Sequence, residues 1–261
     1  MAIEVANVSV RFGGVIALNG VSARIEPGRI VTVIGPNGSG KSTLFNTITG
    51  MVVPASGGVS IDGWNLEGVA THRRIAAGVA RTFQTPRFDP AVNVEEAVLC
   101  GFYPQSRATL FATLLRSASV ARTEQSFRER GEKVLADFRL SSLKHMALGE
   151  LPMGQVRLVE VARAIANEPK YLLLDEPAAG LSKEEQRLLG DEIRRVAKSG
   201  VGILLVEHNF ALVRALSDHV MVLDRGSLLL EGRPEELLRS QAFVDAYLGT
   251  SHANHQETGS A

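Results

Sequence analysis

Apolar and polar residues alternate along residues 4–12, which is the pattern of a strand with one buried face. Residues 29–35 instead form an apolar, β-branched run that ends in a glycine, as a fully buried strand would. Residues 42–50 have the pattern of a helix that its final glycine closes. A short strand is expected between glycines at 57–63. Strands and helices therefore alternate from the start of the chain, which indicates an α/β architecture.

The pattern changes between about residues 86 and 150, where helical spacing replaces the alternation of strands. Asn93 followed by Glu96 forms an Asn-headed relative of the capping box, which predicts the start of a helix. Residues 110–140 are rich in Leu, Ala, Arg and Glu at helical spacing. We therefore predict a mainly helical subdomain over about residues 86–160, inserted in the α/β core.

The α/β pattern resumes after this subdomain. The elements expected are a strand at 171–177, a helix from about Lys183, a strand at 201–208, a second helix, and the segment 219–232. The last dozen residues, 250–261, are polar and are predicted to be disordered. Residues 1–249 are accordingly expected to form a single domain.

Composition is that of a soluble globular protein, with 45% hydrophobic and 21% charged residues. Lys plus Arg number 28 and so do Asp plus Glu, so net charge gives no reason to expect nucleic acid as a partner. A single cysteine, Cys100, excludes an intrachain disulfide and fits a reducing compartment. The first residues lack a signal-peptide pattern, and no apolar run reaches the length of a membrane span. Any membrane association is therefore expected to come through a partner.

The segment GPNGSGKST matches the pattern G-x-x-x-x-G-K-[ST] and lies between a predicted buried strand and a predicted helix. Glycines let the backbone wrap around phosphate oxygens, and the helix N-terminus adds a positive end. Lys41 would neutralise the β- and γ-phosphates, and Ser42 would offer its hydroxyl to Mg²⁺. A glycine-rich turn without a ligand is the alternative, which the sequence context disfavours. The predicted nucleotide-binding residues are Gly35, Asn37, Gly38, Ser39, Gly40, Lys41, Ser42 and Thr43.

Two carboxylates stand at the end of the predicted strand 171–174. Acids at the carboxyl end of a strand lie where open α/β sheets bind ligands. Asp175 is predicted to hold Mg²⁺, as a Walker B aspartate does, and Glu176 to act as the general base that activates water. A solvated strand end is the alternative, but the phosphate loop requires a Walker B partner.

His208 and Gln84 are the remaining candidates for catalysis. A lone histidine is usually structural, but His208 follows a buried strand as Asp175 does, which favours contact with a γ-phosphate. Gln84 lies just before the helical subdomain, where its amide could reach Mg²⁺ or the attacking water. The Gln84 motif is weak by itself and gains value from its order along the chain.

Taken in order, these motifs resemble the ATP-binding subunit of an ATP-binding cassette (ABC) transporter over residues 3–249. The resemblance implies a P-loop NTPase of the ABC ATPase type, with an N-terminal antiparallel β subdomain and an inserted helical subdomain. It implies that Phe12 stacks on adenine, that Gln84 belongs to the Q-loop and that His208 is the switch histidine. The implied cofactors are ATP and Mg²⁺.

A narrower resemblance, to the ATPases of branched-chain amino acid importers, rests on GPNGSGKSTLFNTITG, GVARTFQ, LLLDEPAAGL and the closing AYLG. It implies a second ATPase subunit, membrane permeases and, indirectly, a periplasmic solute-binding protein as partners. The implied location is the cytoplasmic face of the inner membrane, reached through the permeases. The implied cargo is a branched-chain amino acid or a related small polar solute.

The segment LPMGQ departs from the family signature Leu-Ser-Gly-Gly-Gln. Apolar residues at 158, 161, 162 and 165 predict an amphipathic helix after it, with Arg157, Glu160 and Arg163 largely off the apolar stripe. Proline is tolerated in the first turn of a helix, so the amides of Met153, Gly154 and Gln155 are predicted still to face an anion. The lost hydroxyl removes about 1.5–3 kcal/mol. We expect a weakened but working site, with a loop that has lost phosphate contact as the alternative.

Ser182 stands where the family's D-loop often ends in aspartate. Ser182 and Glu185 form an S-x-x-E pattern, so Ser182 is predicted to cap the next helix.

Two other functions are possible for a protein with the same fold. A cassette ATPase in DNA repair or translation usually carries long coiled coils or two cassettes, and this chain shows neither. A non-catalytic cassette is disfavoured by intact Lys41, Asp175, Glu176 and His208.

Overall fold

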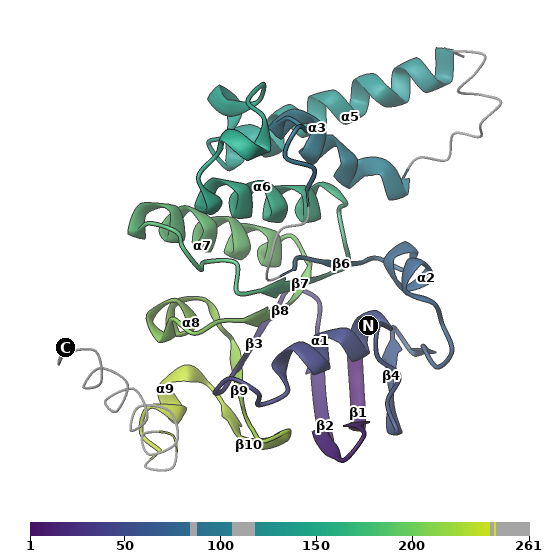
Figure 1. Cartoon of the computed structure of the whole chain (residues 1–261), viewed down its shortest axis with the longest axis vertical. Helices are drawn as coiled ribbons and strands as arrows, with labels where there is room; N and C mark the ends of the chain where they lie inside the picture. Colours follow the sequence, from purple (N-terminus) through teal and green to yellow (C-terminus); the bar gives the residue numbers. More distant parts are fainter. Residues whose placement is uncertain (84–87, 106–117, 241–242, 244–261) are drawn as a thin grey trace. The chain divides into compact units, whose positions relative to one another are not determined.

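The computed structural model describes residues 1–83, 88–105, 118–240 and 243 (Figure 1). It divides into two compact units, which we call unit 1 (Met1–Arg74 with Gly202–Ala261) and unit 2 (Ile75–Val201). The segment 110–117 of the expected long helix and the expected disordered tail at 250–261 lie outside the described residues.

Unit 1 contains an antiparallel sheet with the strand order β2-β1-β4-β5. Its strands are β1 (Ile3–Phe12), β2 (Val15–Ile25), β4 (Ser56–Ile61) and β5 (Trp64–Asn65). The strands predicted at 4–12 and 57–63 are confirmed as β1 and β4. Ile3 and Val5 are buried in alternation with exposed residues, and after a register shift Val8 and Val10 are buried in the same way. The antiparallel β subdomain that the family resemblance implied is thus present.

Strand β2 was not among the predicted elements. Its ladder with β1 is irregular, with register shifts that begin at Val5, Val8 and Val10 of β1. Gly20, within β2, has a left-handed backbone at φ 63°. A bulge places an extra residue in the strand and breaks the period of two. No single alternation of apolar and polar residues therefore runs through β2.

The buried sheet of unit 1 centres on β3 (Ile30–Ile34), which is parallel to both β8 (Gly202–Val206) and β9 (His219–Asp224). Strand β10 (Ser227–Gly232) is antiparallel to β9. Every residue of β3 and of β8 is buried. This explains why both strands appear in the sequence as continuous apolar runs, since parallel strands are covered on both faces.

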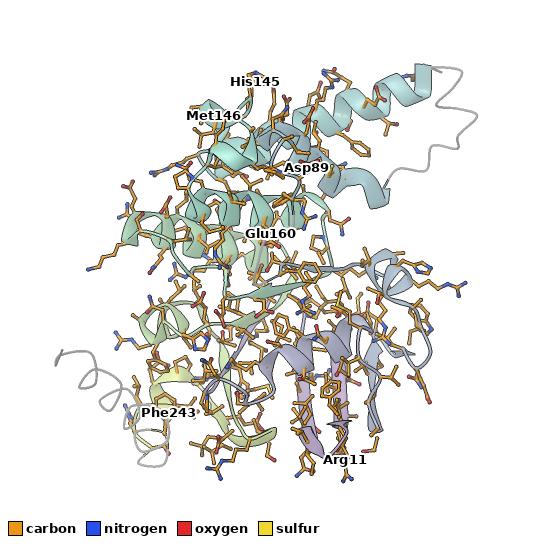
Figure 2. The ribbon with its side chains drawn as sticks, in the orientation of Figure 1. Arg11, Asp89, His145, Met146, Glu160 and Phe243 are labelled. Carbon is orange, nitrogen blue, oxygen red and sulfur yellow. The ribbon has the colours of Figure 1, made fainter. Side chains whose placement is uncertain are left out.

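Unit 1 also contains helices α1 (Lys41–Thr49), α8 (Phe210–Leu216) and α9 (Pro234–Leu237). Phe243 is fully buried and lies beside Phe210, with ring centroids 5.2 Å apart (Figure 2). The hydrophobic cluster around it consists of Ile34, Val213, Val220, Val222, Leu237 and Phe243. Residues from β3, β9, α8 and α9 thus share one core with Phe243.

Helix α1 ends as predicted at Gly50, whose left-handed backbone has φ 79°. The buried guanidinium of Arg74, from α2 (Thr71–Ala76), donates to the carbonyls of Thr47 and Ile48 at 2.9 Å each. It also donates to the carbonyl of Leu66 at 2.7 Å. Burial lowers the pKa of Arg74. A cation at the C-terminal end of α1 satisfies carbonyls that the helix itself leaves open.

Unit 2 contains the parallel strands β6 (Val79–Arg81) and β7 (Tyr171–Asp175). Its helices are α3 (Val94–Leu99), η1 (Cys100–Gln105), α5 (Ala118–Asp137), η2 (Ser141–Leu143), η3 (Leu148–Glu150), α6 (Met153–Ala166) and α7 (Lys183–Lys198). Among the described residues between β6 and β7, every regular element is a helix, joined by turns and by one isolated bridge between Asn93 and Ala147 (Figure 1). The predicted helical character of this part of the chain is thus present. The short strand β6 was not predicted.

Both predicted capping boxes are present in unit 2. The side chain of Asn93 accepts the amide of Glu96 at 2.8 Å, and Ser182 accepts the amide of Glu185 at 3.3 Å. Each glutamate in turn accepts the amide of its cap residue. Ser182 is therefore the N-cap of α7.

Within the described residues, no helix combines the length and apolar character that a membrane span requires.

Candidate nucleotide site

The predicted phosphate loop connects β3 to α1 and contains two glycines that no other residue could replace without collision. A Cβ on Gly35, at φ 153°, would lie 2.1 Å from the carbonyl oxygen of Leu223 and 2.6 Å from Oγ of Ser39. A Cβ on Gly40, at φ 104°, would lie 2.6 Å from the carbonyl oxygen of Ala17. The loop therefore packs too closely against neighbouring backbone and side-chain atoms to leave room for a Cβ at either position.

Lys41 is buried inside this loop. Its Nζ donates to the carbonyl oxygens of Gly35 at 2.8 Å and of Pro36 at 2.9 Å. Oγ of Ser39 is also buried and has no hydrogen-bond partner among the described residues. A buried hydroxyl without a partner is uncommon in a folded protein, so Oγ of Ser39 is a group that a ligand or a water would satisfy.

The loop ends at the N-terminus of α1. The first hydrogen bond of the helical ladder runs from the amide of Leu44 to the carbonyl of Gly40 at 2.9 Å. The amides of Lys41, Ser42 and Thr43 come before that ladder, and Ser42 is exposed. Helix amides that precede the ladder, with the helix dipole behind them, form an anion site. Together with the Ser39 hydroxyl and the Lys41 ammonium, they make a donor set that fits phosphate groups.

His208 lies at the same edge of the buried sheet as the phosphate loop. Strands β3 and β8 are parallel and pair Val33 with Val206, so Gly35 and His208 each lie two residues beyond that pair. His208 is exposed, and its amide donates to the carboxylate of Glu207 at 3.2 Å. Unit 1 thus places an imidazole beside the strand that leads into the loop. Its contact with a γ-phosphate stays a prediction.

Phe12 is the last residue of β1 and pairs with Val15 across the turn to β2. Its side chain is 53% exposed, and Val15 and Ile16 beside it are exposed as well. An exposed aromatic ring at a hairpin tip has a free face on which a base could stack. The predicted contact with adenine is compatible with this position but is not tested by it.

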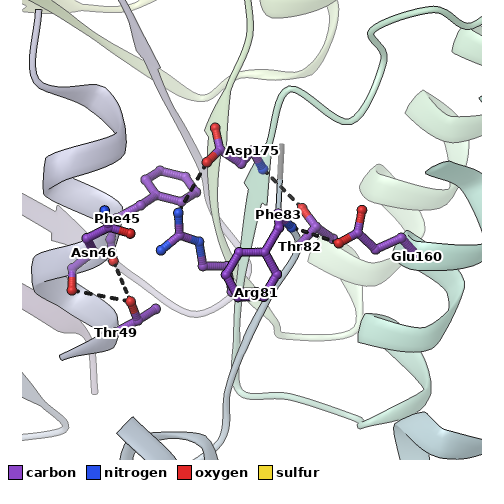
Figure 3. Close-up of polar contacts among 8 residues, drawn as sticks. All are labelled: Phe45, Asn46, Thr49, Arg81, Thr82, Phe83, Glu160 and Asp175. Carbon is purple, nitrogen blue, oxygen red and sulfur yellow. Dashed lines mark hydrogen bonds and ion pairs between the residues drawn. The ribbon is translucent and has the colours of Figure 1, made fainter. Parts of the chain in front are cut away.

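In unit 2, Asp175 ends the fully buried strand β7 and is itself 4% exposed. Its Oδ2 lies 3.2 Å from Nη2 of Arg81, and its amide donates to Oγ1 of Thr82 at 3.1 Å (Figure 3). Burial lowers the pKa of Arg81, and the charge of Asp175 opposes that shift. The carboxylate that was predicted to hold Mg²⁺ is therefore held by the end of β6, a contact that sequence motifs did not predict.

Glu176, the predicted base, has a left-handed backbone at φ 48°. That conformation is uncommon for a residue with a Cβ and costs about 1–3 kcal/mol, and such residues are frequent at functional sites. Nη1 of Arg157 donates to the Glu176 carbonyl at 3.2 Å and holds this turn. The side chain of Glu176 is half-buried.

The signature segment confirms one expectation and corrects another. Helix α6 begins at Met153, and its first ladder bond runs from the amide of Val156 to the carbonyl of Pro152 at 3.2 Å. The amides of Met153, Gly154 and Gln155 precede that bond, and their contact with an anion stays a prediction. Pro152, however, is the N-cap with extended backbone and lies just before the first turn rather than in it. Met153 is 60% exposed.

The amphipathic description of α6 was incomplete. Leu158, Val161 and Ala162 are buried as predicted, but Glu160, which was placed off the apolar stripe, is only 2% exposed. Its Oε1 accepts the amide of Phe83 at 2.8 Å. Burial raises the pKa of Glu160, and the hydrogen bond from the amide of Phe83 partly opposes this shift.

Gln84, which follows Phe83, lies outside the described residues, so its predicted role stays a prediction.

The fold and the loop define the class of the protein. The family described as ABC transporter matches residues 18–179, which is more than half of the chain. The chain belongs to the ABC transporter family, and its α/β P-loop fold of the ABC ATPase type is confirmed.

Within this family, the chain is similar to ATP-binding proteins of branched-chain amino acid transport. BraF, a high-affinity branched-chain amino acid transport ATP-binding protein of Pseudomonas aeruginosa, is 35% identical over 248 residues, 95% of this chain and 97% of BraF. LivG of Escherichia coli K12, which has the same description, shows the same identity and coverage. A crystal structure of a nucleotide-free ATP-binding cassette from an ABC transporter aligns with TM-score 0.81 and 30% identity, covering 95% of this chain and 99% of that one. The ADP conformation of an ABC transporter cassette aligns equally well at 31% identity.

Proposed function

We propose that this chain is the ATP-binding and ATP-hydrolysing subunit of an ABC importer that takes up branched-chain amino acids or a related small polar solute. The observation that carries the ATPase proposal is the phosphate loop. It contains the buried Lys41, the Ser39 hydroxyl without a partner among the described residues, and the backbone amides that begin α1. Identity to importer ATPases over nearly the whole chain supports the importer over a cassette of DNA repair or translation.

The residues divide the work of hydrolysis. The loop amides and Lys41 bind and orient the phosphates, and Phe12 stacks on the adenine. Glu176 orients the attacking water and accepts its proton, while His208 holds the γ-phosphate. Gln84 contacts the water or the metal.

Mg²⁺, when bound, neutralises charge on the β- and γ-phosphates. Ser42 and Asp175 would hold it, together with Gln84. One hydroxyl and one carboxylate are enough ligands from the protein, because Mg²⁺ keeps several water ligands and also binds the phosphates of the nucleotide. The described residues contain no group of three or more His, Cys, Asp or Glu side chains that could hold a metal.

Catalysis would take place in a dimer of ATPase subunits, either two copies or this chain with a paralogue. In that dimer the amides of Met153, Gly154 and Gln155 face the γ-phosphate bound by the opposite subunit. Closure around two ATP molecules drives the permeases, and hydrolysis reopens the dimer. The subunit lies at the cytoplasmic face of the inner membrane through those permeases, which receive solute from a periplasmic binding protein.

Glu176→Gln tests the proposed chemistry. The variant should bind ATP as the wild type does but turn over about 10²–10⁴-fold more slowly, because it lacks a general base. Phosphate release by the purified full chain and equilibrium ATP binding separate the two effects. Unchanged turnover would remove Glu176 from this role.

Co-expression with and without candidate permeases tests the transporter assignment. The chain should pellet with membranes only when its permeases are present. Co-purification with ribosomes or DNA instead would refute the import proposal.

A further inference from the structure

Helix α6 carries a buried carboxylate that the ATPase motifs do not explain. Glu160 lies on the helix that begins within the signature segment and is 2% exposed (Figure 2). Its Oε1 accepts the amide of Phe83 at 2.8 Å, although the two residues are 77 positions apart in sequence (Figure 3). An ionisable group is rarely buried without a specific partner, because removing it from water is costly.

The residues just before Phe83 hold Asp175. Nη2 of Arg81 lies 3.2 Å from Oδ2 of Asp175, and Oγ1 of Thr82 accepts the amide of Asp175 at 3.1 Å. The amide of Thr82 donates to the carbonyl of Leu173 at 2.9 Å. Arg81 and Thr82 thus bond to residues of β7, and Phe83, the next residue, bonds to α6.

The same side of α6 also reaches the turn after β7. Arg157 precedes Glu160 by three residues, a spacing that puts both on one helix face. Nη1 of Arg157 donates to the carbonyl of Glu176 at 3.2 Å. One face of α6 therefore contacts the residue that follows Thr82 and the residue that follows Asp175.

We propose that Glu160 is a positioning residue: its carboxylate fixes the Phe83 amide and so keeps Arg81 and Thr82 in place to orient Asp175. Glu160 acts through Asp175 and touches neither nucleotide nor metal. This inference rests on the proposed role of Asp175 in holding Mg²⁺. A group that orients a metal-holding carboxylate is worth about 10–100-fold in metal affinity or activity.

Three substitutions change the hydrogen bond in different ways. Glu160→Gln keeps an oxygen acceptor at the same length, Glu160→Asp withdraws the acceptor by one methylene, and Glu160→Ala removes it. Val159→Ala is the matched control, because Val159 is the adjacent residue of α6, is fully buried and contributes no polar side-chain atom. It weakens the packing of the helix without touching the Phe83 amide.

The readout is the affinity of the full chain for ADP, measured by calorimetry with EDTA and at a series of free Mg²⁺ concentrations up to saturation, which gives the apparent Mg²⁺ affinity. In the wild type, Mg²⁺ should tighten binding. Glu160→Ala and Glu160→Asp should leave the EDTA value unchanged and lose about 10–100-fold in the apparent Mg²⁺ affinity. Glu160→Gln and Val159→Ala should stay close to wild type in both. Should Glu160→Ala fail to fold, the Asp and Gln variants carry the same comparison.

Asp175→Asn separates this inference from the function on which it rests. Normal Mg²⁺ dependence in Asp175→Asn would overturn both. A defective Asp175→Asn with a normal Glu160→Asp would overturn the inference alone. Equal defects in the Gln and Asp variants would also overturn it, because the acceptor position would then not matter, as would an equal defect in Val159→Ala.

Discussion

Gly35→Ala tests whether the phosphate loop is as tightly wound as its geometry indicates. The new Cβ would lie 2.1 Å from the carbonyl oxygen of Leu223, which is backbone and cannot rotate away. Overpacking of this kind costs about 1–3 kcal/mol. The backbone at φ 153° adds strain of about 1–3 kcal/mol for a residue with a side chain. The sum, about 2–6 kcal/mol, is a large share of a typical total stability.

Gly38→Ala is the matched control in the same loop. Its φ of 80° is also left-handed, but a Cβ there meets no atom within 4 Å. Only the backbone strain of about 1–2 kcal/mol should remain. Urea unfolding of both full-length variants, followed by circular dichroism, should place the Gly35→Ala midpoint well below that of Gly38→Ala. Equal midpoints would refute the steric argument for Gly35.

Three further predictions concern other parts of the chain. Pro152→Ser should give ATPase activity equal to or above wild type, because it returns a hydroxyl to the signature; a large drop would assign Pro152 a specific role. Arg74→Met should lower the free energy of unfolding by about 1.5–3 kcal/mol, because carbonyls at the end of α1 lose a charged donor; Arg74→Lys should recover only part of that in a thermal melt, and an unchanged melting temperature for the Met variant would contradict the argument. Burial raises the pKa of Glu160 in the folded state, so the wild type loses stability as pH rises from the usual glutamate value of 4.5 through that raised pKa. Glu160→Gln does not ionise, and its free energy of unfolding relative to wild type should therefore increase over the same pH range. An equal difference in unfolding free energy at every pH would contradict this prediction.

Features with partners nearby in sequence could be predicted. Gly50, Asn93 and Ser182 end or begin helices through bonds that reach no more than four residues, so the pattern of a few neighbours identifies them. The phosphate loop belongs to the same group, since its pattern is contiguous.

Features that depend on distant partners could not be predicted. Arg74 and Glu160 are charged residues on helices, and sequence periodicity assigns such residues to solvent. Arg74 donates to carbonyls that lie 5 to 27 residues away, and Glu160 accepts an amide 77 residues away. Strand β2 was missed for a related reason, because its bulges arise from pairing with β1. The pairing of Arg81 with Asp175 likewise depends on β6 lying beside β7.

Phe243 sets a limit on how far the chain can be shortened. Its ring fills the space beside Phe210 and has no exposed surface. A protein cut before this residue would open a void in the core of unit 1, and the rings and aliphatic groups that now enclose it would meet water. A purification tag or fluorescent fusion is therefore better attached beyond Phe243 than in place of it.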